Sequence, residues 1–172
     1  MPRRRDSSRD DDGHTANTVE ALRRIIHALR TSAGLAEARV GVTGAQLFVL
    51  QILAESPALS LNELAQRTLT HQSTVSVVVN RLARRGLVTK RRSEDDGRRV
   101  ELRLSPEGKA LVRRSPQVAQ GRLIEGLHAL PVREGRELAR LLRRLVAAMG
   151  AAREPAAMFF ADTDDGGYRK GP

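Results

Sequence analysis

The stretch from residue 61 to residue 105 constrains the fold most, because three local patterns follow one another in it. Residues 61–69 have the apolar spacing of a short helix, and residues 71–86 form a longer helical run that ends at a glycine. Between Leu87 and Leu104 the apolar period changes to two around the turn-forming residues Glu94–Gly97, which predicts a β-hairpin. Two helices followed by a hairpin with basic residues on both sides of its turn are typical of a winged helix-turn-helix that binds duplex DNA.

Three capping boxes predict where the helices before and within this stretch begin. In such a box the N-cap side chain accepts from the backbone amide three residues later, and a Glu or Gln at that position reaches back to the N-cap amide. The boxes are Asn17–Glu20, Thr43–Gln46 and Ser60–Glu63. The first helix is expected to run to about Ala38 and stop near Gly41, and the second to end before Pro57. Thr70 is expected to cap the helix that ends at Gly86.

Helical patterns continue on the C-terminal side of the hairpin. Ser105 and Pro106 place a cap and a first-turn proline at the start of a long helix, and a further helix runs from about Pro131 to Gly150. The apolar stripe of this last helix is wide and consists of Leu138, Leu141, Leu142, Leu145 and Met149. Residues 43–104 alone make a minimal core, so apolar stripes outside them need a surface to cover them. We expect a homodimer joined by the first helix and the last two; the alternative is that these helices pack on their own domain.

The predicted fold is therefore mainly α with a small β-hairpin wing, a winged helix-turn-helix with flanking dimerisation helices. Five segments are expected: a disordered arm of mixed charge (1–16), an N-terminal dimerisation helix (17–42), the DNA-binding lobe (43–104), C-terminal dimerisation helices (105–150) and a flexible tail (151–172). Within the tail, Met158–Phe160 is apolar. Three roles are open for it: packing on the dimer helices, filling a groove, or none in a loose tail.

The charge of the chain favours a polyanionic partner, since the formal net charge is +10 and the pI is about 11.4. Lys90, Lys109 and Lys170 are the only lysines among the 30 basic residues, so a codon bias toward arginine is an alternative explanation. The placement of the charge supports a DNA partner, because between His71 and Arg99 eight Arg or Lys stand against three Asp or Glu.

Several classes of protein are excluded or disfavoured by what the sequence lacks. The absence of cysteine excludes disulfides, thiolate metal sites and cysteine-based redox sensing. No apolar run approaches the roughly 20 residues of a membrane span, and residues 1–13 lack the apolar core of a signal peptide, so a cytoplasmic protein is expected. Without a Gly-rich phosphate loop, a Cys nucleophile or a metal-ligand spacing, neither an enzyme nor a cofactor is expected.

The helix that follows His71 divides into two faces when residues are placed 100° apart. Val75, Val78, Val79 and Leu82 share one arc, which predicts a buried face. The candidate DNA-contacting residues opposite and beside it are Gln72, Ser73, Thr74, Ser76, Val77, Asn80, Arg81 and Arg84. Gln72 and Asn80 suit bidentate contacts to adenine, and Val77 suits a thymine methyl. Arg84 suits a phosphate. The alternative is an ordinary solvated surface.

The hairpin offers a second candidate contact, in the minor groove, where narrow tracts concentrate negative potential. Lys90, Arg91 and Arg92 precede its turn, and Arg98 and Arg99 follow it. Asp96 is expected to position the Arg98 guanidinium through a bidentate pair. The alternative here is a solvated charged loop.

These pieces together resemble the MarR family of transcriptional regulators. The motifs that carry the resemblance are Ser60–Ala65, Ser73–Ser76, Arg81–Val88, Asp96–Arg98 and Leu102–Gly108, and the flanking helices extend it to residues 18–150. The resemblance implies a triangular homodimer that binds pseudo-palindromic operators, usually as a repressor. It also implies a small ligand, often aromatic or phenolic, that binds between the dimer helices and the DNA-binding lobe and releases DNA.

Two residues depart from the family pattern on the predicted groove face. Val77 stands where the family often has arginine, and Asn80 where it often has aspartate, so an operator sequence cannot be borrowed from relatives. The lack of cysteine rules out the thiol-based peroxide-sensing branch. His14, His27, His71 and His128 are scattered, unlike the ligands of the zinc-responsive branch.

The predicted function is a sequence-specific dimeric DNA-binding regulator, and the resemblance implies a repressor that a small apolar or anionic effector releases from its operator. With one Tyr and three Phe, an effector pocket would be lined mainly by Leu, Ile, Val and Ala. His27, Arg30 and Arg39 would either meet an anionic effector or face solvent. The alternative function is an effector-independent architectural protein that binds DNA with weak specificity, which the basic arm would suit.

Overall fold

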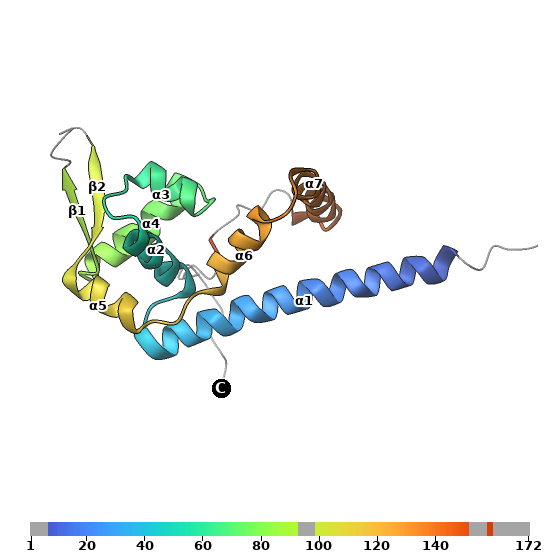
Figure 1. Ribbon diagram of the computed structural model, residues 1–172, viewed down its shortest axis with the longest axis horizontal. Helices are drawn as coiled ribbons and strands as arrows, with labels where there is room; N and C mark the ends of the chain where they lie inside the picture. Colours follow the sequence, from blue (N-terminus) through green and yellow to red (C-terminus); the bar gives the residue numbers. More distant parts are fainter. Residues whose placement is uncertain (1–6, 93–98, 152–157, 160–172) are drawn as a thin grey trace, which may run out of the picture.

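The computed structural model describes residues 7–92, 99–151 and 158–159, and they form a mainly helical fold with one antiparallel hairpin (Figure 1). The elements in chain order are α1 (Ser7–Val40), α2 (Gly44–Glu55), α3 (Leu61–Arg67), α4 (Gln72–Arg84), β1 (Val88–Arg92), β2 (Val100–Leu104), α5 (Pro106–Arg114), α6 (Ala119–His128) and α7 (Val132–Ala148). Figure 1 shows α2–α5 and the hairpin gathered at the C-terminal end of the long α1, with α6 between this lobe and α7. The predicted fold class is confirmed. Among the described helices, none is both long and apolar enough to cross a membrane.

The core of the lobe is built around α2, in which nine of twelve residues are buried. A helix that is apolar on all sides has to be surrounded, and α2 contacts α1, α3, α4, α5 and β2. The largest fully buried side chains are Leu47, Leu50, Leu53, Leu64, Leu82, Leu102, Val42, Val49, Val75 and Val79. The four residues predicted for the buried face of α4 are all buried.

Two of the three predicted capping boxes are confirmed. Thr43 Oγ1 accepts from the amide of Gln46 at 3.3 Å, and the Gln46 side chain accepts in return from the Thr43 amide at 3.4 Å. Ser60 and Glu63 form the same pair, with the return bond from the Ser60 amide at 2.7 Å. These boxes start α2 and α3 where the sequence places them.

The end of α4 and the start of the wing are set by one Schellman motif. Gly86 has a φ of +71°, its amide donates to the Ala83 carbonyl at 3.0 Å, and the Leu87 amide donates to the Leu82 carbonyl at 3.0 Å. β1 and β2 then pair from Val88 opposite Leu104 to Arg92 opposite Val100. The amide of Leu102 also donates to the Leu59 carbonyl at 2.8 Å, so the segment before α3 holds the hairpin against the lobe.

The prediction of a disordered arm up to residue 16 is wrong from residue 7 onward, because α1 begins at Ser7. The box at Asn17–Glu20 does not form a helix start. Thr18, inside the helix, donates its hydroxyl to the His14 carbonyl at 2.8 Å. Residues 7–17 contain no proline, and the lone Gly13 costs about 1 kcal/mol, which a 34-residue helix tolerates.

The prediction that Thr70 caps α4 is also wrong. The N-cap is His71, which makes no side-chain capping bond, and the Thr70 hydroxyl donates backward to the Thr68 carbonyl at 3.0 Å. The cause is the turn between the helices. Leu69 takes a left-handed conformation with φ +51°, and the Thr70 amide closes back on the Ala65 carbonyl at 3.0 Å.

The long helix predicted after Ser105 is divided into α5 and α6. Ser105 caps α5 as predicted, accepting from the Gly108 amide at 2.9 Å. Ser115 is extended (ψ 153°) because Pro116 disfavours a helical conformation in the residue before it. The linker between α5 and α6 is held by Gln51 of α2, whose side-chain Nε2 donates to the Pro116 carbonyl at 2.8 Å.

We predict opposite effects for two glycine-to-alanine substitutions in helices. At Gly108 the added Cβ would lie 2.1 Å from the carbonyl oxygen of Leu87, so α5 would have to move away from the base of the wing. Gly108→Ala should lower the free energy of unfolding by about 1–3 kcal/mol. Gly126→Ala in α6, whose Cβ would meet no described atom within 4 Å, should raise it by about 0.5–1 kcal/mol. Urea denaturation followed by circular dichroism measures both, and a stabilising Gly108→Ala would contradict this packing.

Candidate nucleic-acid interface

The solvent face of α4 carries the side chains that the sequence assigns to a DNA groove. Gln72, Ser73, Asn80 and Arg84 are exposed, and Thr74, Ser76 and Arg81 are half-buried at the edges of this face. Val77 is 52% exposed although it is apolar. Because the buried valines fix the rotation of α4, the small polar residues are turned outward without a neighbouring element covering them.

One of these residues makes a contact that the sequence did not predict. Lys90 on β1 donates from Nζ to Asn80 Oδ1 at 2.6 Å. Since an ammonium group only donates, the amide oxygen of Asn80 faces the wing and its NH2 group points the other way. A bidentate contact of Asn80 to adenine would therefore share an oxygen that already accepts from Lys90.

The strands of the wing present further basic residues. Arg91 and Arg92 on β1 are exposed, and they lie opposite Glu101 and Val100 in the register of the hairpin. Arg98 and its expected positioning partner Asp96 lie outside the described residues. Their proposed pairing stays a prediction.

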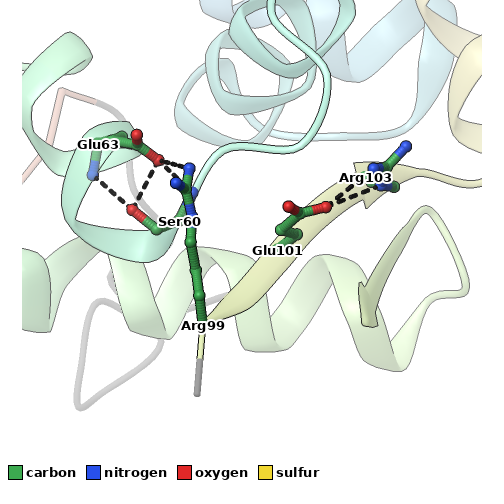
Figure 2. A network of polar contacts seen from close by, with 5 residues as sticks. All are labelled: Ser60, Glu63, Arg99, Glu101 and Arg103. Carbon is green, nitrogen blue, oxygen red and sulfur yellow. Dashed lines mark hydrogen bonds and ion pairs between the residues drawn. The ribbon is translucent and has the colours of Figure 1, made fainter. Parts of the chain in front are cut away.

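Arg99, also predicted to contact DNA, is engaged within the protein. Its Nη2 donates to Glu63 Oε2 at 2.6 Å, across to α3 (Figure 2). The same carboxylate oxygen accepts from the amide and the hydroxyl of Ser60, each at 2.7 Å. The bond from the Ser60 amide, the bond from its hydroxyl and the Arg99 charge together hold the pKa of Glu63 below its usual value. The capping box thus also anchors the C-terminal strand of the wing.

A large cleft of about 1130 Å³ lies behind the helix-turn-helix. Its walls come from α1, α3, the α3–α4 turn, α6, α7 and Met158–Phe159, and among the described residues that line it none is Asp, Glu, Lys or Arg. At one edge it reaches His71 and Gln72, where α4 begins. His27, Arg30 and Arg39, considered for an anionic effector, are exposed and do not belong to this lining.

The tail reaches this cleft. Met158 is 4% exposed and belongs to the buried apolar cluster, and Phe159 lies at the cleft wall with 51% of its surface exposed. A loose tail is therefore wrong at Met158, and the groove-filling role is the one that fits. Phe160 lies outside the described residues. Among those described, no group of three or more His, Asp or Glu gathers as metal ligands would.

We predict that the contacts of Glu63 with Ser60 and Arg99 stabilise the fold in a pH-dependent way, and that Glu63→Gln removes this dependence. A carboxyl whose pKa is lower in the folded than in the unfolded chain stabilises the fold above the unfolded value of 4.5, and this contribution is lost as the pH falls through the folded pKa. The stability difference between the native chain and Glu63→Gln should thus be constant near pH 6–7 and shrink below about pH 4.5. Arg99→Gln should show the same trend. Urea denaturation at several pH values measures it, and parallel curves for native and Glu63→Gln chains would contradict the network.

Known proteins share this architecture and sequence. A model of the MarR family matches residues 40–99, which span α2 to the wing. The HTH-type transcriptional repressor Rv2887 of Mycobacterium tuberculosis is 29% identical over 124 residues, which cover 72% of this chain and 89% of that protein. A MepR-like protein solved with pseudoligands has 25% identity and a TM-score of 0.50, with 77% of this chain and 94% of that one covered.

The likeness of the fold extends further. The transcriptional regulator BldR from Sulfolobus solfataricus superposes with a TM-score of 0.51, covering 81% of this chain and 96% of that one, at 22% identity. The matched residues include the capping box of α3, the solvent face of α4 and the strand that carries Lys90. Residues 40–99 therefore match the MarR family, and the chain is similar to transcriptional regulators of that family.

Proposed function

We propose that the chain is a dimeric repressor that reads a pseudo-palindromic operator and is released from it by a small apolar effector. The observation that carries the proposal is the uncovered face of α4, with small polar side chains and Val77 turned outward beside a basic wing. A major groove admits one helix, and small polar side chains allow its backbone to approach the base edges. The wing, tied to α4 by Lys90, would contact the adjoining backbone or minor groove.

An architectural protein that binds DNA without sequence preference is the second candidate, and the basic composition favours it. The solvent face of α4 argues against it. A helix that held only phosphates would be expected to carry Lys or Arg at Ser73, Val77 and Asn80. These three positions are suited to base edges instead.

We predict that two substitutions separate base reading from phosphate binding. Gln72→Ala removes an amide from the start of α4 and should weaken operator binding about tenfold while reducing discrimination between operator and mutated duplexes. Arg91→Ala should weaken binding to all duplexes alike and lower the slope of log affinity against log salt by about 1. Arg24→Ala on α1, 80% exposed, is the matched control and should leave binding unchanged. Fluorescence anisotropy with the DNA upstream of the chain's own gene measures these effects; equal affinity of the native chain for unrelated duplexes would favour the architectural alternative.

The dimer would be formed by α1 and the C-terminal helices. None of the α7 residues is buried, although Leu141, Leu142, Leu145 and Val146 present an apolar face between 40% and 45% exposed. Ile25 and Ile26 on α1 are similarly exposed. A second copy of the chain is the economical cover for these faces, and it would also set the spacing of two α4 helices, about 34 Å for successive major grooves.

We predict that a charge on this face dissociates the dimer. Leu145→Glu should shift the protein from dimer to monomer at micromolar concentration, because an unpaired carboxylate would be buried in an apolar interface. Arg143→Glu lies about 160° away around the same helix and should remain dimeric. Size-exclusion chromatography with light scattering distinguishes the two, and a dimeric Leu145→Glu variant would place the interface elsewhere.

The effector site would be the cleft behind the helix-turn-helix. The described part of its lining contains no Asp, Glu, Lys or Arg, which favours an apolar effector over an anionic one. Because the cleft borders the first residues of α4, a ligand there would favour a dimer whose α4 helices no longer match the operator spacing. The ligand would release DNA only to the extent that it binds the mismatched arrangement of the dimer more tightly than the DNA-bound arrangement.

A further inference from the structure

We infer that the tail of the chain is the resident ligand of this cleft, with Met158 as the side chain that fills part of it and Phe159 at its wall. Met158 is 4% exposed and packs in the same buried cluster as the core of the lobe. α7 ends at Ala148, Gly150 follows it with a φ of +75°, and Met158, eight residues beyond Gly150, lines the cleft. The tail lies beyond residues 40–99, which the family model matches.

The side chain and the cleft are chemically matched. A methionine is unbranched and polarisable, and it adapts to irregular apolar gaps. The same cleft is lined by Leu29 of α1, Leu69 of the α3–α4 turn and Ile124 of α6. Among the described residues of the lining none is Asp, Glu, Lys or Arg, so the surroundings of Met158 there carry no formal charge.

The cleft volume of about 1130 Å³ is the space that remains with Met158 and Phe159 in the lining. This space would admit a small apolar compound, and a compound that needs the position of Met158 has to displace it. Because Met158 is part of the same chain as the cleft, its competition with such a compound is intramolecular and does not weaken on dilution. The tail therefore weakens the apparent affinity for any such compound. If the compound is the effector, the tail raises the effector concentration needed to release DNA, and this part of the inference rests on the proposed function. The occupancy of the cleft by Met158 does not rest on it.

The chain carries its own probes for this contact, because its three methionines are Met1, Met149 and Met158. Met149 lies on the stripe of α7 that a second copy would cover, so the same protein unfolded in urea serves as the control. In the full-length protein with 13C-labelled methionine methyl groups, a soluble nitroxide should leave the Met158 signal sharp, and in the unfolded protein it should broaden that signal. Saturation with the uncharged apolar dye Nile red should then expose Met158 to the nitroxide. A Met158 signal broadened in the free protein, or still protected with the dye bound, would overturn the inference.

Three variants complete the test. Met158→Ala should bind the dye several-fold more tightly than the native chain, Met158→Leu should bind it like the native chain, and Arg143→Ala, away from the cleft and from the apolar face of α7, should not differ from it. Cooperative urea unfolding establishes that each variant is folded; if Met158→Ala is not, the nitroxide experiment on the native chain still decides. Equal dye affinity of a folded Met158→Ala variant and the native chain would overturn the inference. No DNA is present in these measurements, so failure to bind an operator would overturn the proposed function alone.

Discussion

The enclosure of α2 is the constraint on which the rest of the structure depends. With nine of its twelve residues buried, this helix requires cover from α1, α3, α4, α5 and β2 together. Gln46 at its start links it to one of these neighbours, α4: its side-chain oxygen completes the Thr43 box and also accepts from Arg85 Nη1 at 3.2 Å, next to the glycine that ends α4. The helix that holds the core therefore also fixes the end of the helix that faces outward, and with it the start of the wing.

Local interactions could be predicted from the sequence, and their limits are physical. The boxes at Thr43 and Ser60 involve bonds over three residues, so the sequence alone specifies them. Serine followed by proline shows the limit. Ser105–Pro106 starts α5, whereas Ser115–Pro116 ends it, and the difference is whether the preceding residues are already helical. Thr70 fails as a cap for a related reason, since the left-handed Leu69 before it turns its hydroxyl back toward α3.

The candidate site was predictable one element at a time. Placing residues at 100° intervals identified both faces of α4, because the valines that are buried decide which side chains are not. The contacts between different elements could not be predicted from the spacing of residues in the sequence. Lys90 reaches Asn80 over ten positions and Arg99 reaches Glu63 over 36, and each pairing exists only after the hairpin has folded onto the helices. As a result, two residues predicted as free to contact DNA, Asn80 and Arg99, already have partners in the protein.

These two contacts also determine how the lobe can respond to a ligand. The wing is attached to α4 through its first strand and to α3 through its second, and the α3–α4 turn forms part of the cleft. A side chain or compound that moves α3 therefore acts on the wing through Glu63 and Arg99, while Lys90 carries the wing with α4. The three elements are thus connected in a closed ring of contacts. In the proposed dimer, such a lobe would change its angle toward DNA as a unit, and the spacing of the two copies would then decide whether both α4 helices still fit successive grooves.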